Sequence, residues 1–227
     1  MEEDLKTKPH FQFFTRLHLS ELTGRRATTI EELLEIIRDV PGACIYHHTH
    51  RFLQQHQYLS PEPPNDFAYW VGKILGEDVL GEKLASIDTI QFSTLRSLRE
   101  KIISTIGDYL QTNPLVKGKF AHPEEAFHFI KSISFVLPTQ YVAFTIEDFL
   151  EIFKKITVDS IYFHIFEARL RLEKKTNDFA WWIETSLGHK KLADRLTQLD
   201  PYTYTLEELR KTIIRNIEEF IVDYDKT

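Results

Sequence analysis

The sequence predicts a mainly α-helical protein with small β elements, an α+β fold class, built as two tandem pseudo-symmetric repeats. Two stretches of roughly a hundred residues resemble each other in order along the chain. Both open with alternating apolar and polar residues and continue with apolar residues at offsets of three and four. Alternation is typical of a strand, and offsets of three and four are typical of a helix. Each repeat is therefore expected to hold a short strand or hairpin followed by about five helices.

Two motifs carry the repetition most clearly. Thr29–Ile37 (TIEELLEII) returns 116 positions later as Thr145–Phe153 (TIEDFLEIF), and Asn65–Trp70 (NDFAYW) returns 112 positions later as Asn177–Trp182 (NDFAWW). Repeats with a fixed order decide the architecture of a chain, so they are considered first. We expect a polar tail at 1–10, repeats at 11–110 and 126–222, a linker at 111–125 and a second tail at 223–227.

The opening of each repeat is predicted to be a strand. Phe11–Leu19 (FQFFTRLHL) and Phe127–Phe135 (FHFIKSISF) alternate with period two. Thr23-Gly24 and Pro138-Thr139 follow these stretches, and such residues favour turns. A short local hairpin in each repeat is the resulting prediction.

Helix starts are marked by residues that can cap them. Thr29 and Thr145 precede apolar runs, and Glu32 three residues later completes the pattern of a capping box. Asp148 is a shorter version of the same acid in the second repeat. Asp66 or Asp178 is expected to cap a further helix through its carboxylate.

Composition limits the classes of function. The 227 residues carry a net charge of −6, which argues against a general affinity for nucleic acid or for an anionic membrane surface. The single cysteine, Cys44, leaves no intramolecular disulfide and no zinc site built from several cysteines. No apolar run approaches the ~18 residues of a membrane span, and the polar start does not read as a secretion signal. We therefore expect a soluble cytoplasmic protein.

A stretch of the first repeat resembles a known family. Ile45–His56 (IYHHTHRFLQQH), the segment Tyr58–Trp70 that follows, and the opening Phe13–Gly24 are similar to a bacterial family of unknown function, DUF5752. Asn177–Trp182 of the second repeat fits the same family. The resemblance spans nearly the whole chain and implies no activity, cofactor or catalytic residue. It implies an association with sugar-metabolism and glycosyltransferase genes, which enters only as an alternative.

Histidines are concentrated in the first repeat. His47, His48, His50 and His56 lie within ten residues, whereas the matching stretch of the second repeat keeps only His164. Phe163 replaces His47 and Phe166 replaces His50. Arg16 and His18 of the opening strand likewise face Ser132 and Ser134 in the alignment of the two repeats. This polar set, which the repeated unit does not require, is the strongest indication of a functional region.

The functional interpretation is a site made of Arg16, His18, His47 and His50. Imidazoles exchange protons near neutral pH and bind divalent metals, so these four are the catalytic candidates and the three histidines are weak metal candidates. Neither spacing is specific, and no His-Glu-x-x-His run accompanies them. The alternative interpretation is a His-rich helix that packs on aromatic neighbours or meets a partner. His48 and His164, which occur in both repeats, are better read as core or as hydrogen bonds between elements.

Other candidates concern ligand or partner contact. Arg51, Gln54 and His56 accompany the histidines, and Trp181 aligns with Tyr69, so it is expected to be half-exposed and able to stack on a sugar ring. Trp182 falls on the apolar face and is expected in the core. Cys44 beside the histidines suggests a thiol nucleophile, although adjacency in sequence does not provide the geometry that such a pair needs.

The favoured function is a non-enzymatic binding or assembly module whose contact site is the His-rich surface of the first repeat. The alternative is a small metal- or His-dependent enzyme, with a link to sugar metabolism, that uses the Arg/His set. No cofactor is implied, and a divalent metal belongs to the alternative. The expected partner is a protein or a small ligand, with carbohydrate as one class, and neither nucleic acid nor membrane. Whether the chain is an enzyme or a homo-oligomer stays open.

Overall fold

The fold is α+β, with helices as its main content and one two-stranded antiparallel sheet, as predicted. The computed structural model describes residues 9–51, 65–168, 176–199 and 205–224. Two compact units divide the chain. Unit 1 contains Met1–Leu17 with Phe135–Thr227, and unit 2 contains His18–Ser134. Among the described residues, no helix is long and apolar enough to cross a membrane.

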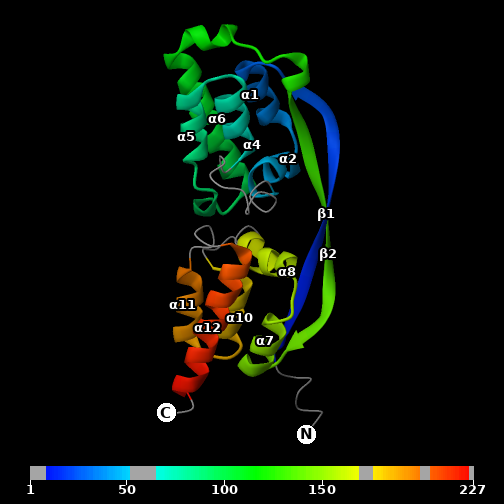
Figure 1. Ribbon diagram of the computed structural model, residues 1–227, viewed down its shortest axis with the longest axis vertical. Coiled ribbons are helices and arrows are strands. Elements are labelled where there is room, and N and C mark those ends of the chain that lie inside the picture. Colours follow the sequence, from blue (N-terminus) through cyan, green and yellow to red (C-terminus); the bar gives the residue numbers. More distant parts are fainter. Residues whose placement is uncertain (1–8, 52–64, 169–175, 200–204, 225–227) are drawn as a thin grey trace. The chain divides into compact units, whose positions relative to one another are not determined.

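The sheet is a ribbon of two long strands, β1 (Phe11–Ala27) and β2 (Phe127–Ala143), which twist about each other in Figure 1. The prediction of a local hairpin in each repeat is wrong. Both strands run on through the predicted turns, because each pairs with a strand more than a hundred residues away. Gly24 accommodates this with a φ of +77°, a left-handed value often found at a β-bulge. Pro138 is tolerated because both strands of a two-stranded sheet are edge strands.

The two strands exchange their ends between the units. Phe11 and Phe13 of β1 lie in the core of unit 1, among helices that come from the second half of the chain. Phe127 and Phe129 of β2 lie in the core of unit 2, among helices from the first half. The compact units therefore follow different boundaries from the predicted repeats, since each set of helices packs against a strand end from the other half of the chain.

The phenylalanine rings of the exchanged strand ends pack against aromatic rings of the helices. Phe13 has no exposed surface, and its ring centroid lies 5.3 Å from that of Phe149. In unit 2 the Phe127 ring stacks on Phe67 at 5.2 Å. A buried phenylalanine is worth about 3–5 kcal/mol when truncated to alanine. The exchanged ends are therefore principal core elements of both units.

The described part of unit 2 holds several short helices, one long helix, α6, and two 3₁₀ turns that follow it. A π-helical turn follows directly on α2 and another on α4, so each extends the α-helix before it. The elements are α1 (Ile30–Asp39), α2 (Gly42–Tyr46), η2 (His47–Arg51), α4 (Asp66–Tyr69), η3 (Trp70–Ile74), α5 (Asp78–Ala85), η4 (Thr89–Gln91), α6 (Leu95–Thr112), η5 (Pro114–Gly118) and η6 (Pro123–Glu125).

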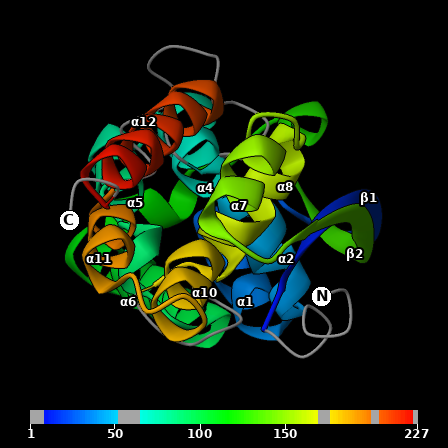
Figure 2. The same cartoon turned by 90° about the horizontal axis from the view of Figure 1, so that it is seen from below.

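Unit 1 has a similar order of elements. Figure 2 shows α7 and α8 between the ribbon and α12. The elements are α7 (Ile146–Phe153), α8 (Val158–Tyr162), η7 (Phe163–Glu167), α10 (Asp178–Thr185), α11 (Lys190–Gln198) and α12 (Leu206–Tyr224).

The caps at Thr29 and Thr145 were predicted correctly, but the capping acids differ from expectation. Thr145 and Asp148 form the reciprocal capping box. Glu32 instead reaches one residue further, where its carboxylate accepts a hydrogen bond from the Thr28 N–H at 2.7 Å. The additional methylene of glutamate explains why the longer acid passes the cap residue. Both predicted acids therefore stabilise the helix starts, by different bonds.

The predicted caps Asp66 and Asp178 are one residue out of register. Asn65 and Asn177 are the N-caps, and their side-chain oxygens accept hydrogen bonds from Ala68 N–H at 2.8 Å and Ala180 N–H at 2.9 Å. An amide oxygen serves at this position as well as a carboxylate does. The side chains of Asp66 and Asp178 instead contact His48 and His164.

Gly72 and Gly81 allow η3 and α5 to approach closely. A Cβ added to Gly81 would lie 2.9 Å from the Gly72 Cα and 3.2 Å from the Ala68 carbonyl oxygen, both backbone atoms. Real side chains do not approach so near, so the two helical segments would have to separate.

We expect Gly81→Ala to destabilise unit 2 by about 1–3 kcal/mol through this overpacking. Gly107→Ala in α6 is the matched control, because no atom lies within 4 Å of its added Cβ. There the change should stabilise the protein by up to about 1 kcal/mol, from the better helix propensity of alanine. Urea unfolding of both variants measures this, and equal effects would contradict the close approach.

Candidate functional site

Three of the four clustered histidines, those of η2, are buried. His47, His48 and His50 lie in η2 with exposures of 7%, 2% and 3%. Thr49 between them is also buried, and its hydroxyl donates to the Ile45 carbonyl at 2.6 Å. These residues therefore do not supply the exposed His-rich contact surface expected from the sequence. Gln54 and His56, the other predicted contacts, lie outside the described residues.

His47 and His50 form local contacts within unit 2. The His47 Nδ1 lies 3.0 Å from the Ser132 hydroxyl, and the His50 Nδ1 lies 3.0 Å from the Thr49 hydroxyl. Burial lowers the pKa of both imidazoles to about 4, and for His47 the neighbouring His48 lowers the pKa further. Both side chains are consequently neutral near pH 7.

The predicted set of four is divided between the units. His18 is half-buried in unit 2, where its Nδ1 lies 3.0 Å from the Ser134 hydroxyl and its ring stacks on Tyr46. His50 also stacks on Tyr46, with ring centroids 5.6 Å apart. Arg16 belongs to unit 1, where it forms an ion pair with the buried Glu167. Unit 2 thus gathers His18 and His50 around Tyr46, and Arg16 has a separate structural partner.

The described residues do not include three or more His, Cys, Asp or Glu side chains placed to hold a metal. Cys44 is fully buried, and burial raises the pKa of its thiol. A raised pKa keeps the sulfur protonated, which is the unreactive form. The predicted contact residue Arg51 is half-buried at the end of η2.

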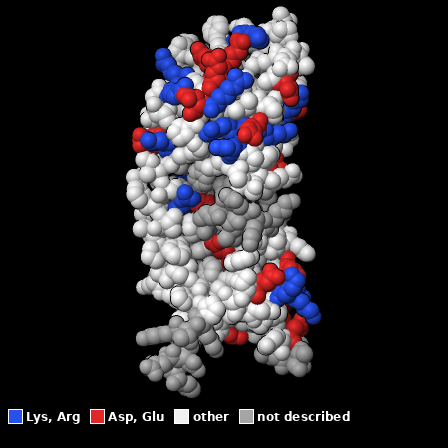
Figure 3. Space-filling view, turned by 180° about the vertical axis from the view of Figure 1, so that it is seen from behind, with Lys and Arg blue, Asp and Glu red and all other residues white. Residues whose placement is uncertain are grey.

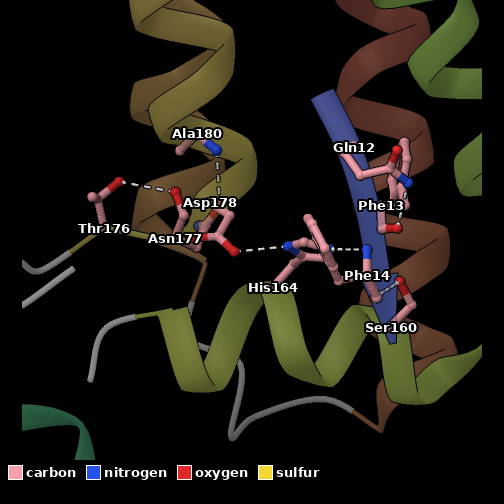
Figure 4. Close-up of polar contacts among 9 residues, drawn as sticks. All are labelled: Gln12, Phe13, Phe14, Ser160, His164, Thr176, Asn177, Asp178 and Ala180. Atoms are coloured by element: carbon pink, nitrogen blue, oxygen red, sulfur yellow. Dashed lines mark hydrogen bonds and ion pairs between the residues drawn. The ribbon is translucent and has the colours of Figure 1, made fainter. Parts of the chain in front are cut away.

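His48 and His164 each bridge an aspartate and a backbone N–H of a strand, an arrangement called the Asp–His–backbone relay below. His164 Nδ1 lies 2.7 Å from the Asp178 carboxylate, and its Nε2 accepts a hydrogen bond from the Phe14 N–H at 2.9 Å (Figure 4). In unit 2, His48 makes the same two contacts, with Asp66 at 2.6 Å and with the Ile130 N–H at 3.0 Å. The prediction that His48 and His164 form hydrogen bonds between elements is confirmed.

The relay fixes the tautomer of each histidine. Because Nε2 accepts a backbone N–H, the proton must be on Nδ1, where it is donated to the aspartate. A second proton on Nε2 would remove the acceptor and leave the strand amide unsatisfied. His48 and His164 are therefore used to hold the incoming strand.

Two further bonds complete this attachment. Trp70 Nε1 donates to the Glu125 carbonyl at 2.7 Å, and Trp182 Nε1 donates to the Pro9 carbonyl at 3.4 Å. Each acceptor lies two residues before the first phenylalanine of the exchanged strand. In unit 1 the Ser160 hydroxyl also donates to the Phe14 carbonyl at 2.6 Å, as Figure 4 shows.

A groove of about 500 Å³ lies beside this attachment in unit 1. Trp181 on α10 is 40% exposed there and Val136 on β2 is 47% exposed. Trp182, the next residue, is 5% exposed. The predicted difference between the two tryptophans is thus confirmed. The lining includes Phe14, Val136, Phe163, Asp178, Trp181 and Thr185.

The sequence indicates Trp181 but not the other groove residues. The polar residues that differ between the two halves of the chain drew attention to the first half, whereas aromatic residues peculiar to unit 1 mark the groove. Phe14 aligns with Ile130, and Phe163 aligns with His47. The same alignment, read for aromatic gains, contains this signal.

The buried neutral histidines should make stability depend on pH. In the unfolded chain a histidine has a pKa near 6.5, against about 4 for His50 in the fold. Between these values the unfolded state binds more protons, so stability is complete above about pH 6.5 and falls as pH drops toward 4. The contribution of His50 is on the order of 3 kcal/mol.

Position 50 aligns with Phe166 of unit 1. His50→Phe introduces the same residue type in unit 2 and should therefore reduce the loss of stability between pH 7 and pH 4.5. Phe166→Leu, at the aligned position of unit 1, serves as the control and should leave the pH dependence as in the parent. Urea titrations across this range provide the readout. If the pH dependence of the unfolding free energy is unchanged in His50→Phe, the folded protein binds the His50 proton as readily as the unfolded chain does, and the lowered pKa is contradicted.

Comparison with known proteins gives a family and a solved relative. The sequence model described as "Family of unknown function (DUF5752)" matches residues 8–218. The solved structure described as "The structure of OrfY from Thermoproteus tenax" is similar, with a TM-score of 0.78 and 28% sequence identity. The similarity covers 93% of this chain and 95% of that chain. No curated protein matches.

Proposed function

The chain belongs to the DUF5752 family, a family of unknown function, and we propose that it acts as a non-enzymatic binding module built from two copies of one helical unit. Duplication is supported by paired features of the two halves. β1 and β2 both span 17 residues, and both are followed by a Thr-capped helix. The Asp–His–backbone relay and the tryptophan bond also occur once in each unit.

Binding is favoured over catalysis by what the histidines contact. A general base needs a ring nitrogen that can reach a substrate proton. The Nε2 atoms of His48 and His164 instead accept strand amides, while His47 and His50 are buried with lowered pKa values. The four residues behind the enzyme hypothesis also have structural contacts. Arg16 pairs with Glu167, His18 lies against the Ser134 hydroxyl, and His47 and His50 are buried.

The ligand site is the groove of unit 1, and the exposed indole of Trp181 is the observation that carries this proposal. An aromatic side chain left 40% exposed beside a groove offers a flat apolar face that a ligand can cover. The volume of about 500 Å³ lies within the range of small-molecule sites. A small ligand is therefore favoured over a protein partner, and a sugar ring stacked on Trp181 is one class that fits.

The distribution of surface charge does not favour a polyanion as the ligand. In Figure 3 basic and acidic side chains are interspersed over the described part of the face shown. Basic side chains also have acidic partners among the described residues: Lys190 pairs with Glu184 and Asp194. Mixed signs of this kind give no broad field to attract nucleic acid.

The test is a ligand screen read by tryptophan fluorescence and thermal stability, with a panel that includes neutral sugars. A ligand at about 100 times its Kd should stabilise the protein by about 2.7 kcal/mol. Trp181→Ala should weaken binding at least tenfold. Tyr69→Ala, at the aligned and 44% exposed position of unit 2, should leave binding unchanged. Binding that survives Trp181→Ala, or a panel with no ligand at all, would overturn the proposal.

A further inference from the structure

We propose that unit 1 is a strand-acceptor site and that the first part of β1, Phe11–Leu17, can be donated to it by a second copy of this chain. Phe11–Leu17 is called the arm. The proposed partner is thus another molecule of the same protein, joined by reciprocal exchange of arms. This inference does not depend on the ligand groove.

The arm is recognised by features that any strand of the same sequence would satisfy. Phe11 and Phe13 enter the core of unit 1, and the Phe14 amide donates to His164. Trp182 donates to the carbonyl of Pro9 just before the arm. Each contact involves a side-chain ring or a backbone group of the strand itself, so a second molecule can provide all of them.

The arm is the part of β1 that packs in unit 1. Phe11–Leu17 lies in unit 1, whereas unit 2 begins at His18, the next residue of the same strand. Donation of the arm to a second molecule would therefore replace the contacts of these seven residues and leave His18–Ala27 in unit 2.

The chain already folds by accepting a strand from a distant segment. Unit 1 takes its arm from more than a hundred residues away, as a donated strand rather than as part of a local hairpin. Exchange of an identical element between molecules costs little, because the contacts in the exchanged and unexchanged forms are the same. A bound strand that completes a sheet and fills core pockets is also a known mode of recognition between chains.

The groove gives the exchange a consequence for the site. Phe11, Gln12 and Phe14 of the arm line the groove together with Trp181 and Asp178 of α10. In an exchanged pair of molecules, each groove would contain residues of both chains. Assembly and ligand binding would then be coupled, because a ligand that contacts both walls holds the donated arm in place.

Competition sets the concentrations that are needed. The arm of the same molecule is present at an effective concentration in the millimolar range, so free exchange is suppressed in the parent protein. Weakening the internal arm removes this competitor without changing the acceptor. Phe13→Ala does so, since Phe13 has no exposed surface in unit 1.

The experiment uses full-length chains and a fluorescent peptide with the sequence of residues 9–17. The Phe13→Ala chain should bind this peptide at least tenfold more tightly than the parent chain. A peptide with alanine in place of Phe11 and Phe13, the two rings that enter the core of unit 1, should not bind. If Phe13→Ala does not remain soluble, Phe11→Ala, which truncates the other ring that the arm places in the core of unit 1, replaces it in the same assay.

Donation by a whole molecule is tested by mixing. His164→Ala impairs the acceptor of one chain and leaves its arm intact, so its arm should dock in the Phe13→Ala chain. Light scattering of the mixture at about 100 μM should show a 1:1 complex that neither variant forms alone. A mixture that stays monomeric, or a peptide that binds both chains equally, would overturn the proposal. Ligand binding by monomers would in that case leave the proposed function intact.

Discussion

The structure depends on the burial of two Phe-x-Phe strand ends, each within helices from the other half of the chain. Phe11 and Phe13 complete unit 1, and Phe127 and Phe129 complete unit 2. Each end fills a core that the helices of its own half of the chain do not line. Neither half of the chain therefore has a complete core by itself. This single constraint explains why β1 and β2 are long and paired with each other.

The shared polar residues follow from the same constraint. A strand that enters an apolar core brings backbone N–H groups that cost free energy if they are left without partners. His48 and His164 accept these N–H groups, and an aspartate in the first turn of α4 or α10 orients each histidine. The NDFA motif thus has two uses. Its asparagine caps the helix, and its aspartate holds the ring that receives the strand.

Much of the local structure could be predicted from sequence. Period-two alternation located both strands, and the threonine caps located α1 and α7. The exposure of Trp181 and the burial of Trp182 followed from helical periodicity. The pairing of strands could not be predicted, because Phe11–Phe13 and Phe127–Phe129 have the same pattern and neither reveals which helices will bury it. Local turn residues such as Gly24 then suggested hairpins that the long-range pairing overrides.

The site was located only in part for a related reason. Histidines that differ between the repeats drew attention to His47 and His50, but burial makes them neutral members of unit 2. A polar residue gained in one repeat can serve local packing, as the stacking of His50 on Tyr46 shows. The groove beside Trp181 arises where α10 meets the exchanged β1. Its lining could not be inferred before that exchange was known.

The central claim, exchange of strand ends between the units, is tested most directly by hydrogen–deuterium exchange of Phe13→Ala in the full-length chain. Phe13 precedes α1 in sequence but packs on Phe149 of α7. The account predicts that amide protection falls in helices α7 to α12 and persists in α1 to α6. Loss of protection in α1 to α6, with α7 to α12 unaffected, would show that each repeat keeps its own strand and would contradict the account.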